Sequence, residues 1–486
     1  MRVIVLGAGM AGILATIKLK QSGYEVICYE KGNNVGGTWR ENTYPGLHCD
    51  TPAHNYAYSF ALNPNWSRYC APGPEIQRYF EQTVDDCGVR GLIQLNREVV
   101  RCEYLDDEWE IETRCGVIDR ATAVIVATGV LHHPVTPNIK GLENFEGDYF
   151  HTARWDHSVA LDGKRIGVIG NGATGVQVVS ALVEKATVKH FQRTPQWILP
   201  IPNTEYTEEQ KAAFRANPQL LVDLKYDEEY FRNVKRFTTA VADASSKEIA
   251  EIQQFCERYL DESIKDPMLR EKLRPTYLAA CKRLIYSPDY YNAIQHPNAE
   301  LITDGIEQVE AKGVRTRDGK LHEVDVLALA TGFNASMFMR PMQVRGRNGV
   351  SLNSFWAKRP TAYYAISMPD FPNLFMLNGP TGPVGNFSLT EIAEFEWDYI
   401  AQLLELLKTG KYSEISVSSD AMAAYEEKRL AKAKKTVFGS GCTSWYLDAE
   451  GVPSTWPWDH NAFEDAMRKP VLEDYQLIAE PESALQ

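Results

Sequence analysis

The stretch RVIVLGAGMAGILATIKLKQSG, residues 2–23, decides the fold class of this chain. It reads as a buried strand, a glycine turn with G-x-G-x-x-G spacing and a helix, in that order. Such glycines permit a tight bend, let the backbone approach a pyrophosphate and let the helix pack on the strand; here they are Gly7, Gly9 and Gly12. The next strand, EVICYE, ends at Glu30, at the spacing where a carboxylate holds a ribose hydroxyl. This element therefore predicts a dinucleotide site in a Rossmann-like fold.

A second copy of the pattern, KRIGVIGNGATGVQVVSAL, occupies residues 164–182. The turn residues expected to contact a nucleotide are Gly170, Gly172, Thr174 and Gly175. The strand after it, TVKHFQR, ends not in an acid but in Arg193, and Thr194 follows. An arginine beside a hydroxyl suits a 2′-phosphate, so we expect NADPH rather than NADH, although a solvated charge at a strand end is an alternative for Arg193. Two sites imply two dinucleotides, and we expect FAD in the other one.

Composition and charge limit the classes of partner. The chain has 486 residues, enough for two or three domains, and 44% of them are hydrophobic, which is ordinary for a globular protein. A net charge of −13 argues against nucleic acid or an anionic membrane as the main partner. The chain opens on a strand rather than a signal peptide, and no apolar run reaches the ~20 residues of a membrane span. Nine cysteines without a CxxC predict reduced thiols, and we expect a cytoplasmic protein.

Two segments that share an Ala-Thr-Gly turn predict how the domains are joined. ATAVIVATGVLHHP (121–134) and VDVLALATGFNAS (324–336) each combine a buried strand with this turn, as expected where the chain passes between two nucleotide domains. A long stretch before the second of them has Glu, Lys, Ala and Leu at helical spacing and few glycines. We therefore expect an α/β fold of two Rossmann-like domains, with a discontinuous FAD domain and a helical insertion in the NADP domain. The expected boundaries are 1–140 and 337–486 for the FAD domain, 141–154 for a linker, 155–205 and 282–336 for the NADP domain, and 206–281 for the insertion.

Further motifs resemble the FAD- and NADPH-dependent Baeyer–Villiger monooxygenases of the single-chain type. FEGDYFHTARWD (145–156) is similar to the family signature F-x-G-x-x-x-H-x-x-x-W-[PD], and GGTWRENTYPGLHCD (36–50) to the signature G-x-W-x-x-x-x-[FY]-P-[GM]-x-x-x-D. The related flavin-containing and N-hydroxylating monooxygenases share the histidine of the first signature but not usually its Trp-Asp ending. The resemblance covers nearly the whole chain, because it extends through CKRLIYSPDYY (281–291), FPNLFMLNGPTGP (371–383) and TSWY (443–446).

This resemblance implies a reaction in two halves. NADPH reduces FAD by hydride transfer, and the reduced flavin adds O2 to give a C4a-peroxyflavin, which attacks a ketone carbonyl and yields an ester or lactone. An anionic peroxide needs a fixed positive partner, and arginine keeps its proton near neutral pH. By resemblance that residue is Arg283, and we expect Asp50 to pair with it and aim it. A turn cap for Asp50 and a surface ion pair for Arg283 are the alternatives.

The resemblance also implies further cofactor contacts. The residues expected along the flavin are Gly37, Thr38 and Trp39. Lys282 should be a second contact for the 2′-phosphate, or else a solvated lysine, and Trp445 should close over the nicotinamide half, or else be a core residue. We expect His151 in a hinge or an interdomain hydrogen bond rather than in catalysis, and His132 and His133 in a loop. The spacing of His, Cys and Asp residues matches no metal site, so no metal ion is expected.

Other functions stay open at this point. A relative that oxygenates nitrogen or sulfur would keep the flavin but would not need an Arg–Asp pair. A flavin disulfide reductase would need a redox-active cysteine pair at the flavin, which the spacing of Cys28 and Cys49 does not offer. A non-catalytic FAD-binding module would leave the second nucleotide site without a purpose. These motifs specify neither the identity of the ketone nor the oligomeric state.

Overall fold

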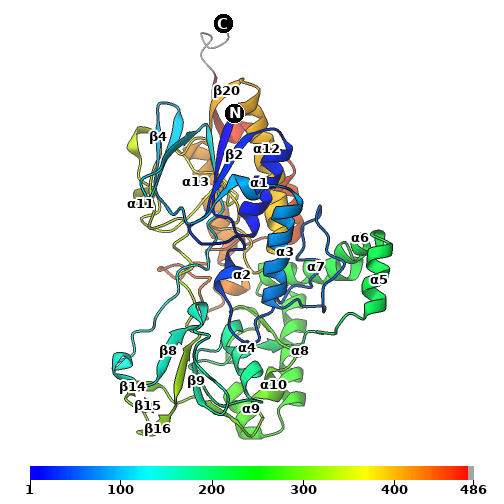
Figure 1. Ribbon diagram of the computed structural model, residues 1–486, viewed down its shortest axis with the longest axis vertical. Helices are drawn as coiled ribbons and strands as arrows, with labels where there is room; N and C mark the ends of the chain where they lie inside the picture. The colour runs from blue at the N-terminus through cyan, green and yellow to red at the C-terminus, as the bar shows by residue number, and fades with distance from the viewer. Residues whose placement is uncertain (480–486) are drawn as a thin grey trace.

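The computed structural model describes residues 1–479, which form two lobes, each built on a five-stranded parallel sheet (Figure 1). The sheet of the first lobe has the strand order β19-β7-β1-β2-β3. Its central strands are buried along almost their whole length, as expected for parallel strands covered on both faces. The strands are β1 (Arg2–Leu6), β2 (Glu25–Tyr29), β3 (Ile93–Gln94), β7 (Ala123–Val126) and β19 (Leu374–Met376).

Three helices pack together beside this sheet. α1 (Met10–Gln21) begins directly after the first glycine turn and is buried on nearly all sides. α3 (Gly73–Asp86) and α12 (Leu389–Lys408) both pack against it. Because α1 is enclosed, its N-terminus is held at a fixed place beside the carboxyl end of β1.

The sheet of the second lobe has the order β13-β10-β9-β17-β8, and α4 (Ala173–Leu182) follows its glycine turn. The segment 141–154, predicted as a linker, contains β8, which pairs in parallel with β17. Four residues at a sheet edge give too short a pattern to be recognised from sequence. The strands are β8 (Asp148–His151), β9 (Arg165–Ile169), β10 (Thr187–Phe191), β13 (Ala299–Ile302) and β17 (Val326–Leu329).

The first lobe is assembled from two parts of the chain. β19 follows the whole second sheet in sequence, yet it pairs with β7. This arrangement confirms the predicted fold class, two Rossmann-like units of which the first is discontinuous. The individual domain boundaries stay predictions, and the last residues of the 337–486 segment, 480–486, lie outside the described residues.

The stretch 206–281 is mainly helical. Side chains cap several of these helices, as Thr207 and Ser246 do by accepting a backbone N–H from the first turn. In Figure 1 α5 and α6 project from the side of the molecule, while α7 packs against α8 and against α14 (His460–Met467) near the end of the chain. The helices are α5 (Glu208–Ala216), α6 (Gln219–Lys225), α7 (Glu228–Ala242), α8 (Lys247–Ser263) and α9 (Pro267–Leu273).

Smaller elements complete both lobes. An antiparallel arrangement β4-β5-β6, extended by β18, belongs to the first lobe, and the antiparallel β14-β15-β16 to the second. The remaining strands are β4 (Val99–Leu105), β5 (Glu108–Thr113), β6 (Ile118–Ala121), β11 (Ile198–Leu199), β12 (Ile285–Tyr286), β14 (Ile306–Glu310), β15 (Gly313–Thr316), β16 (Leu321–Glu323), β18 (Gln343–Arg345), β20 (Tyr412–Val417) and β21 (Tyr475–Ala479). The remaining α-helices are α2 (Thr38–Glu41), α10 (Tyr290–Ala293), α11 (Leu352–Phe355) and α13 (Ser419–Ala433), and the 3-10 helices are Arg90–Leu92, Leu142–Asn144, Thr152–Arg154, Arg347–Gly349, Val437–Gly439 and Leu472–Asp474.

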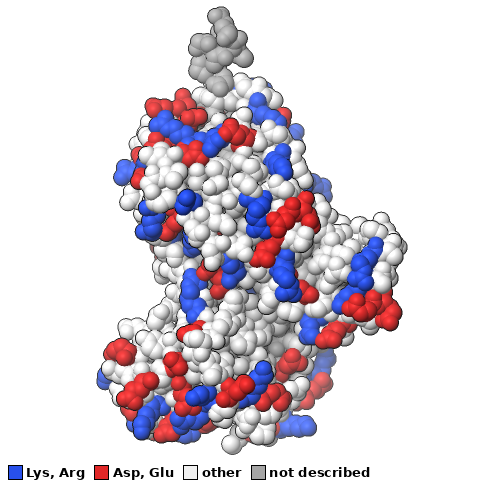
Figure 2. All heavy atoms as spheres, in the orientation of Figure 1, with Lys and Arg blue, Asp and Glu red and all other residues white. Residues whose placement is uncertain are grey.

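The visible surface carries both signs of charge. Figure 2 shows lysine and arginine interspersed with aspartate and glutamate over both lobes, without a broad field of one sign on this face. Within residues 1–479, no helix combines the length and the apolar character needed to cross a bilayer.

Two of the nine cysteines form a disulfide, so the expectation of reduced thiols throughout is wrong in this structure. Cys281 and Cys442 are joined across 161 residues of sequence. The other seven are free, and most of them are buried. A pairing over such a separation leaves no local spacing such as CxxC, which is why the sequence did not reveal it.

Candidate active site

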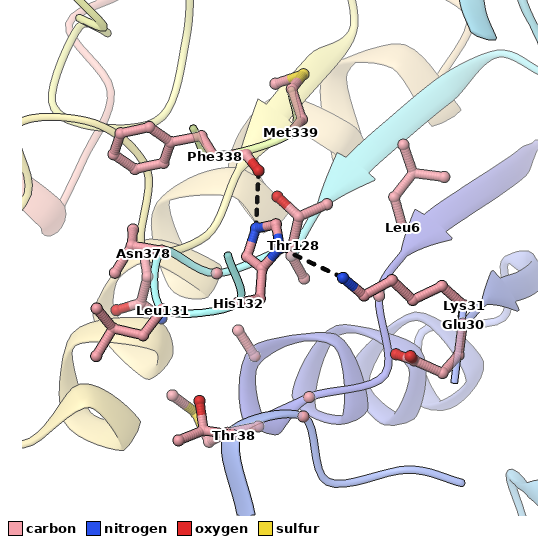
Figure 3. Close-up of a pocket in the computed structure, with 18 of the residues that line it drawn as sticks. Leu6, Glu30, Lys31, Thr38, Thr128, Leu131, His132, Phe338, Met339 and Asn378 are labelled. Atoms are coloured by element: carbon pink, nitrogen blue, oxygen red, sulfur yellow. Dashed lines mark hydrogen bonds between the residues drawn. The ribbon is translucent and has the colours of Figure 1, made fainter. Parts of the chain in front are cut away.

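A pocket opens at the carboxyl end of β1, where loops from both parts of the first lobe meet (Figure 3). Gly12 does not line it. A Cβ at Gly12 would collide with the Gly7 carbonyl oxygen, so a glycine there lets the helix pack directly on the turn. α1 begins at Gly9 without a side-chain cap, which leaves its first N–H groups free for an anion. The expected residues that line the pocket are Gly7, Gly9, Glu30, Gly37, Thr38 and Trp39.

Two backbone segments approach each other in this pocket, at Gly9 and Gly37. Gly37 has a φ of +54°, which favours glycine, and a Cβ there would lie 2.9 Å from the Gly9 Cα. Side chains at these positions would fill the space in which a dinucleotide contacts the backbone. A bare glycine cradle beside an uncapped helix N-terminus therefore fits the diphosphate of FAD.

Glu30 is buried and held from three sides. Its Oε2 accepts the Ala8 N–H at 2.7 Å, and its Oε1 accepts the Gly32 N–H at 2.7 Å. The Arg40 guanidinium donates to the same Oε1 at 2.9 Å, so the buried charge is paired. Sequence reasoning missed Arg40, although it stands in the quoted GGTWR motif. Its guanidinium fixes the carboxylate that faces the pocket.

The far wall of the pocket contains residues that the sequence analysis did not place in the cofactor site (Figure 3). His132 Nε2 donates to the Phe338 carbonyl oxygen at 2.9 Å, and its Nδ1 lies 3.4 Å from Lys31 Nζ. Burial, reinforced by the charge of Lys31, lowers the pKa of His132 to about 4, so its ring is neutral and structural. The Asn378 Oδ1 is buried and, within residues 1–479, has no hydrogen-bond partner, which leaves an acceptor free on a pocket residue. Asn378 stands in the quoted FPNLFMLNGPTGP stretch, but no spacing rule marks it.

The second glycine turn repeats this geometry in the other lobe. Gly170 has a φ of +107°, and a Cβ at Gly175 would collide with the Gly170 carbonyl oxygen. A Cβ at Gly172 would meet nothing within 4 Å, and α4 starts there without a side-chain cap. Open space beside uncapped N–H groups fits the pyrophosphate of a second dinucleotide.

A loop of the first lobe docks on α4 next to this turn. The Thr174 hydroxyl donates to the Tyr44 hydroxyl at 3.3 Å, and the Tyr44 hydroxyl donates to Gln177 Oε1 at 2.9 Å. Gln177 in turn donates to the carbonyl oxygen of His48 at 3.0 Å. The loop that ends at Asp50 is thereby anchored to the second lobe.

Arg193 follows β10 near the second glycine turn, and its charge acts on Lys282. Arg193 is exposed and Lys282 is half-buried. Burial lowers the pKa of Lys282, and the positive charge of Arg193 lowers it further. The Thr194 carbonyl oxygen accepts from Asn171 at 2.7 Å, which ties this strand end to the glycine turn. Two neighbouring cations at the rim of a dinucleotide site suit an additional phosphate.

Asp50 and Arg283, 233 residues apart in sequence, are in contact. Arg283 Nη2 donates to Asp50 Oδ2 at 2.6 Å. Their side chains keep 34% and 22% of their surface exposed, so the pair is partly open to solvent. The charge of Asp50, with a smaller effect from Tyr446, raises the pKa of Arg283 above its usual range although partial burial opposes the rise, so the guanidinium stays charged.

Trp445 lies on a second, smaller pocket. It is 41% exposed, which excludes the alternative of a core tryptophan. The same pocket is lined by Tyr446 and by residues 379–382. The contact of Trp445 with nicotinamide stays a prediction.

His151 joins two segments by hydrogen bonds. Its Nδ1 accepts the Ala153 N–H at 3.1 Å, which leaves the proton on Nε2 to donate to the Gly332 carbonyl oxygen at 3.0 Å. Gly332 belongs to the second Ala-Thr-Gly turn. Nowhere in the described chain do three or more His, Cys, Asp or Glu side chains gather in a group that could hold a metal ion.

Comparison with known sequences identifies the relatives of this chain. The family model of pyridine nucleotide-disulphide oxidoreductases matches residues 4–208. A Baeyer–Villiger monooxygenase from Streptomyces coelicolor is 34% identical, over 98% of this chain and 92% of that protein. An uncharacterized monooxygenase from Mycobacterium tuberculosis is 44% identical, over 88% of this chain and 86% of that protein.

Solved structures agree with the sequence comparison. Cyclohexanone monooxygenase from Rhodococcus sp. Phi1, bound to NADP+, has a TM-score of 0.86 at 30% identity and covers 98% of this chain and 99% of its own. An oxidized steroid monooxygenase bound to NADP has a TM-score of 0.86 at 27% identity and covers 99% of this chain and 100% of its own. With two dinucleotide units in one chain and these relatives along its full length, the protein belongs to the Baeyer–Villiger monooxygenases, enzymes that use FAD and NADPH.

Proposed function

We propose that this enzyme uses NADPH and O2 to insert one oxygen atom beside the carbonyl of a small ketone, giving an ester or a lactone. The contact between Asp50 and Arg283 carries the proposal, because oxygenation of a carbonyl needs a fixed positive charge where negative charge develops. Bound FAD, once reduced by NADPH, supplies the activation of O2 and the transfer of the oxygen atom.

Arg283 supplies the charge, and Asp50 supplies its orientation. A unit charge about 4 Å from a developing negative charge contributes roughly 4 kcal/mol at an effective dielectric near 20. That corresponds to about three powers of ten in rate. Arginine suits the role better than lysine, because burial readily depresses a lysine pKa, whereas Arg283 keeps its proton. Asp50 engages Nη2, so the guanidinium N–H groups that neither Asp50 nor Tyr446 uses can face a substrate.

The cofactor contacts follow the two glycine turns. We assign FAD to the pocket of the first lobe, with Glu30 on its ribose, and NADPH to the second turn, with Arg193, Thr194 and Lys282 on its 2′-phosphate. Trp445 would lie over the nicotinamide half. Support comes from the bare glycine cradle at Gly9 and Gly37 and from the two neighbouring cations.

The test separates the two halves of the reaction. Arg283→Ala and the parent are mixed with NADPH without oxygen, and then with air and a panel of simple ketones. We expect both proteins to bleach their flavin, and only the parent to make ester; the variant should consume O2 and release hydrogen peroxide. Arg120→Ala is a matched control, since it removes an arginine–glutamate pair on an exposed strand of the first lobe. Ester formation by Arg283→Ala at the parent's rate would refute the role of Arg283.

The same panel tests the alternative reaction. A parent enzyme that oxygenates amines or sulfides but no ketone would indicate oxygenation of nitrogen or sulfur instead. That reaction does not need the Asp50–Arg283 pair, so Asp50→Asn should then leave its rate unchanged.

Partner and location follow from the same proposal. The partner is a small ketone rather than a nucleic acid, in line with the net charge of −13, and a DNA or RNA mobility shift at low salt would contradict this. We propose a cytoplasmic location, which cell fractionation checks. We also propose the domain boundaries given above as the points at which limited proteolysis divides the chain.

A further inference from the structure

The Cys281–Cys442 disulfide joins the segments that carry Arg283 and Tyr446. Cys281 precedes Arg283 by two residues, and Cys442 precedes Tyr446 by four. Both cysteines are buried. The covalent link therefore ties a segment of the second lobe to the C-terminal part of the chain, beside the arginine of the proposed site.

The Tyr446 hydroxyl lies beside the guanidinium that Asp50 also holds, and Tyr446 contributes to the raised pKa of Arg283. Asp50 takes Nη2, whereas Tyr446 meets the guanidinium near Gly385, beside Nη1. A Cβ at Gly385 would collide with the Tyr446 hydroxyl and would lie 2.7 Å from Arg283 Nη1. Because Gly385 has no side chain, there is room for the Tyr446 hydroxyl next to Arg283 Nη1.

Tyr446 is itself held in place. Its carbonyl oxygen accepts from Ser454, at 2.8 Å from the backbone N–H and 3.0 Å from the hydroxyl. Its ring lies 4.4 Å from that of Phe438, between centroids, and only 2% of the residue is exposed. Burial raises the pKa of Tyr446, so its hydroxyl is neutral. A neutral acceptor can orient the guanidinium without cancelling its charge, which a second carboxylate would do.

We propose that Tyr446 is a positioning residue, which holds Arg283 at Nη1 while Asp50 holds Nη2, and that the Cys281–Cys442 disulfide closes this clamp covalently. The inference rests on the proposed function, since the clamp serves the charge that Arg283 contributes to oxygenation. It assigns a role to Tyr446, Gly385 and the disulfide, to which the proposed function gives none.

Tyr446→Phe removes only the hydroxyl and tests the clamp directly. We expect an unchanged rate of anaerobic flavin reduction by NADPH and about tenfold less ester per NADPH consumed, with the balance as hydrogen peroxide, because a hydrogen bond to a charged group is lost. Tyr226→Phe is the matched control, since Tyr226 is exposed. A Tyr446→Phe enzyme with the parent's ester yield would overturn the positioning role.

Gly385→Ala tests the same contact by adding a methyl group between the Tyr446 hydroxyl and Arg283. The added methyl separates the Tyr446 hydroxyl from Nη1, and the φ of +85° disfavours alanine, so ester yield should fall at least as far as in Tyr446→Phe. A double-mutant cycle of Tyr446→Phe with Arg283→Met in thermal unfolding measures the contact without any turnover. Additive effects in that cycle overturn the clamp. If the parent enzyme makes no ester but the effects in the cycle are non-additive, the proposed function is contradicted while the contact between Tyr446 and Arg283 is supported.

The disulfide is tested by counting thiols. Without reductant, the denatured chain should titrate seven thiols, which is the nine cysteines less the two in the bond. Dithiothreitol breaks the S–S bond, which takes up two electrons and two protons, and is itself oxidised to its cyclic disulfide, so nine thiols should then titrate. The reduced enzyme and Cys442→Ser should both lose a few-fold in ester yield and keep flavin reduction. Nine thiols before reduction, or an unchanged yield after it, would overturn this part of the proposal.

Discussion

The two glycine turns share one backbone design but end in residues of opposite charge. Gly7 and Gly170 both have positive φ, +99° and +107°, and each is packed against by the third glycine of its own turn. The strands that follow lead to Glu30 in the first lobe and to Arg193 in the second. Under the proposed function, the backbone would recognise the diphosphate that both cofactors share, whereas the strand end would distinguish a ribose hydroxyl from a 2′-phosphate.

The surroundings of the two end residues differ as much as their charges. Glu30 is buried and already paired with Arg40, so its carboxylate is fixed before a cofactor binds. Arg193 is exposed and has the positive Lys282 near it. The first site is thus preorganised by an internal ion pair, while the second gathers like charges that an incoming phosphate would neutralise. One fold can thus present a paired carboxylate at one site and two neighbouring cations at the other.

Replacing the third glycine of either turn should have the largest effect, on a different cofactor in each case. A Cβ at Gly12 or at Gly175 would collide with the carbonyl oxygen of the first glycine, so the helix must move away from its strand. We expect Gly12→Ala to lower the flavin content of the purified protein about tenfold or more. We expect Gly175→Ala to keep its flavin and lose about tenfold or more in kcat/KM for NADPH. Flavin absorbance per chain and anaerobic reduction rates measure the two effects.

Gly172→Ala is the control for this pair, because a Cβ there meets nothing within 4 Å. It should keep the stability and the flavin content of the parent. Loss of flavin to the same extent in Gly12→Ala and Gly175→Ala would break the comparison, since the two turns would then not serve separate cofactors.

Removing the arginine of each site should affect stability very differently. Arg40→Ala leaves the buried Glu30 unpaired, and we expect a loss of about 3 kcal/mol in the free energy of unfolding. Arg193→Ala removes an exposed charge and should change it by less than about 0.5 kcal/mol. Denaturant unfolding measures both. Adding Glu30→Gln to Arg40→Ala should recover part of the loss, and equal losses in the two arginine variants would contradict the contrast.

The features that the sequence predicted depend on short-range patterns along the chain. Glycine spacing, a buried strand and the residue at the end of the next strand act within about thirty residues, and they predicted the fold class and the two nucleotide units. The pairing of Asp50 with Arg283 joins residues 233 positions apart, and only the resemblance to a family suggested it. The Cys281–Cys442 bond, which spans 161 residues, had no such signal at all.

Residues that act through another side chain were the hardest to find. Arg40 stands within a quoted motif, yet only the structure reveals that it neutralises Glu30. Tyr446 was quoted next to Trp445, but its contact with Arg283 depends on how the C-terminal segment crosses to the second lobe. Sequence patterns describe the elements, while such contacts depend on how the lobes are oriented, which no local spacing encodes.

Arg193→Ala should lower the preference of the enzyme for NADPH over NADH, because it weakens the use of NADPH alone. Loss of a charge-assisted contact to the 2′-phosphate should lower kcat/KM for NADPH about tenfold and leave that for NADH nearly unchanged. Lys185→Ala, an exposed lysine after α4, serves as a control for the general charge of the lobe. Steady-state kinetics with both nucleotides give the preference. Equal losses with NADPH and NADH would mean that Arg193 contacts a part common to both.

The smallest expected effect is a dependence of KM for NADPH on pH, which Lys282 should confer on the second site. Burial and the charge of Arg193 lower the pKa of Lys282 below its ordinary value of 10.5. The ammonium is charged at lower pH and attracts the 2′-phosphate, so KM for NADPH should rise a few-fold as the pH increases through that lowered pKa. Lys282→Arg stays charged and should flatten the rise, whereas Arg193→Ala removes one cause of the lowered pKa and should move the rise to higher pH. KM for NADH should not follow this pH profile, because NADH has no 2′-phosphate. A KM for NADH that rises in the same way would mean that the titrating group contacts a part common to both nucleotides. That result would contradict the contrast drawn between Glu30 and Arg193.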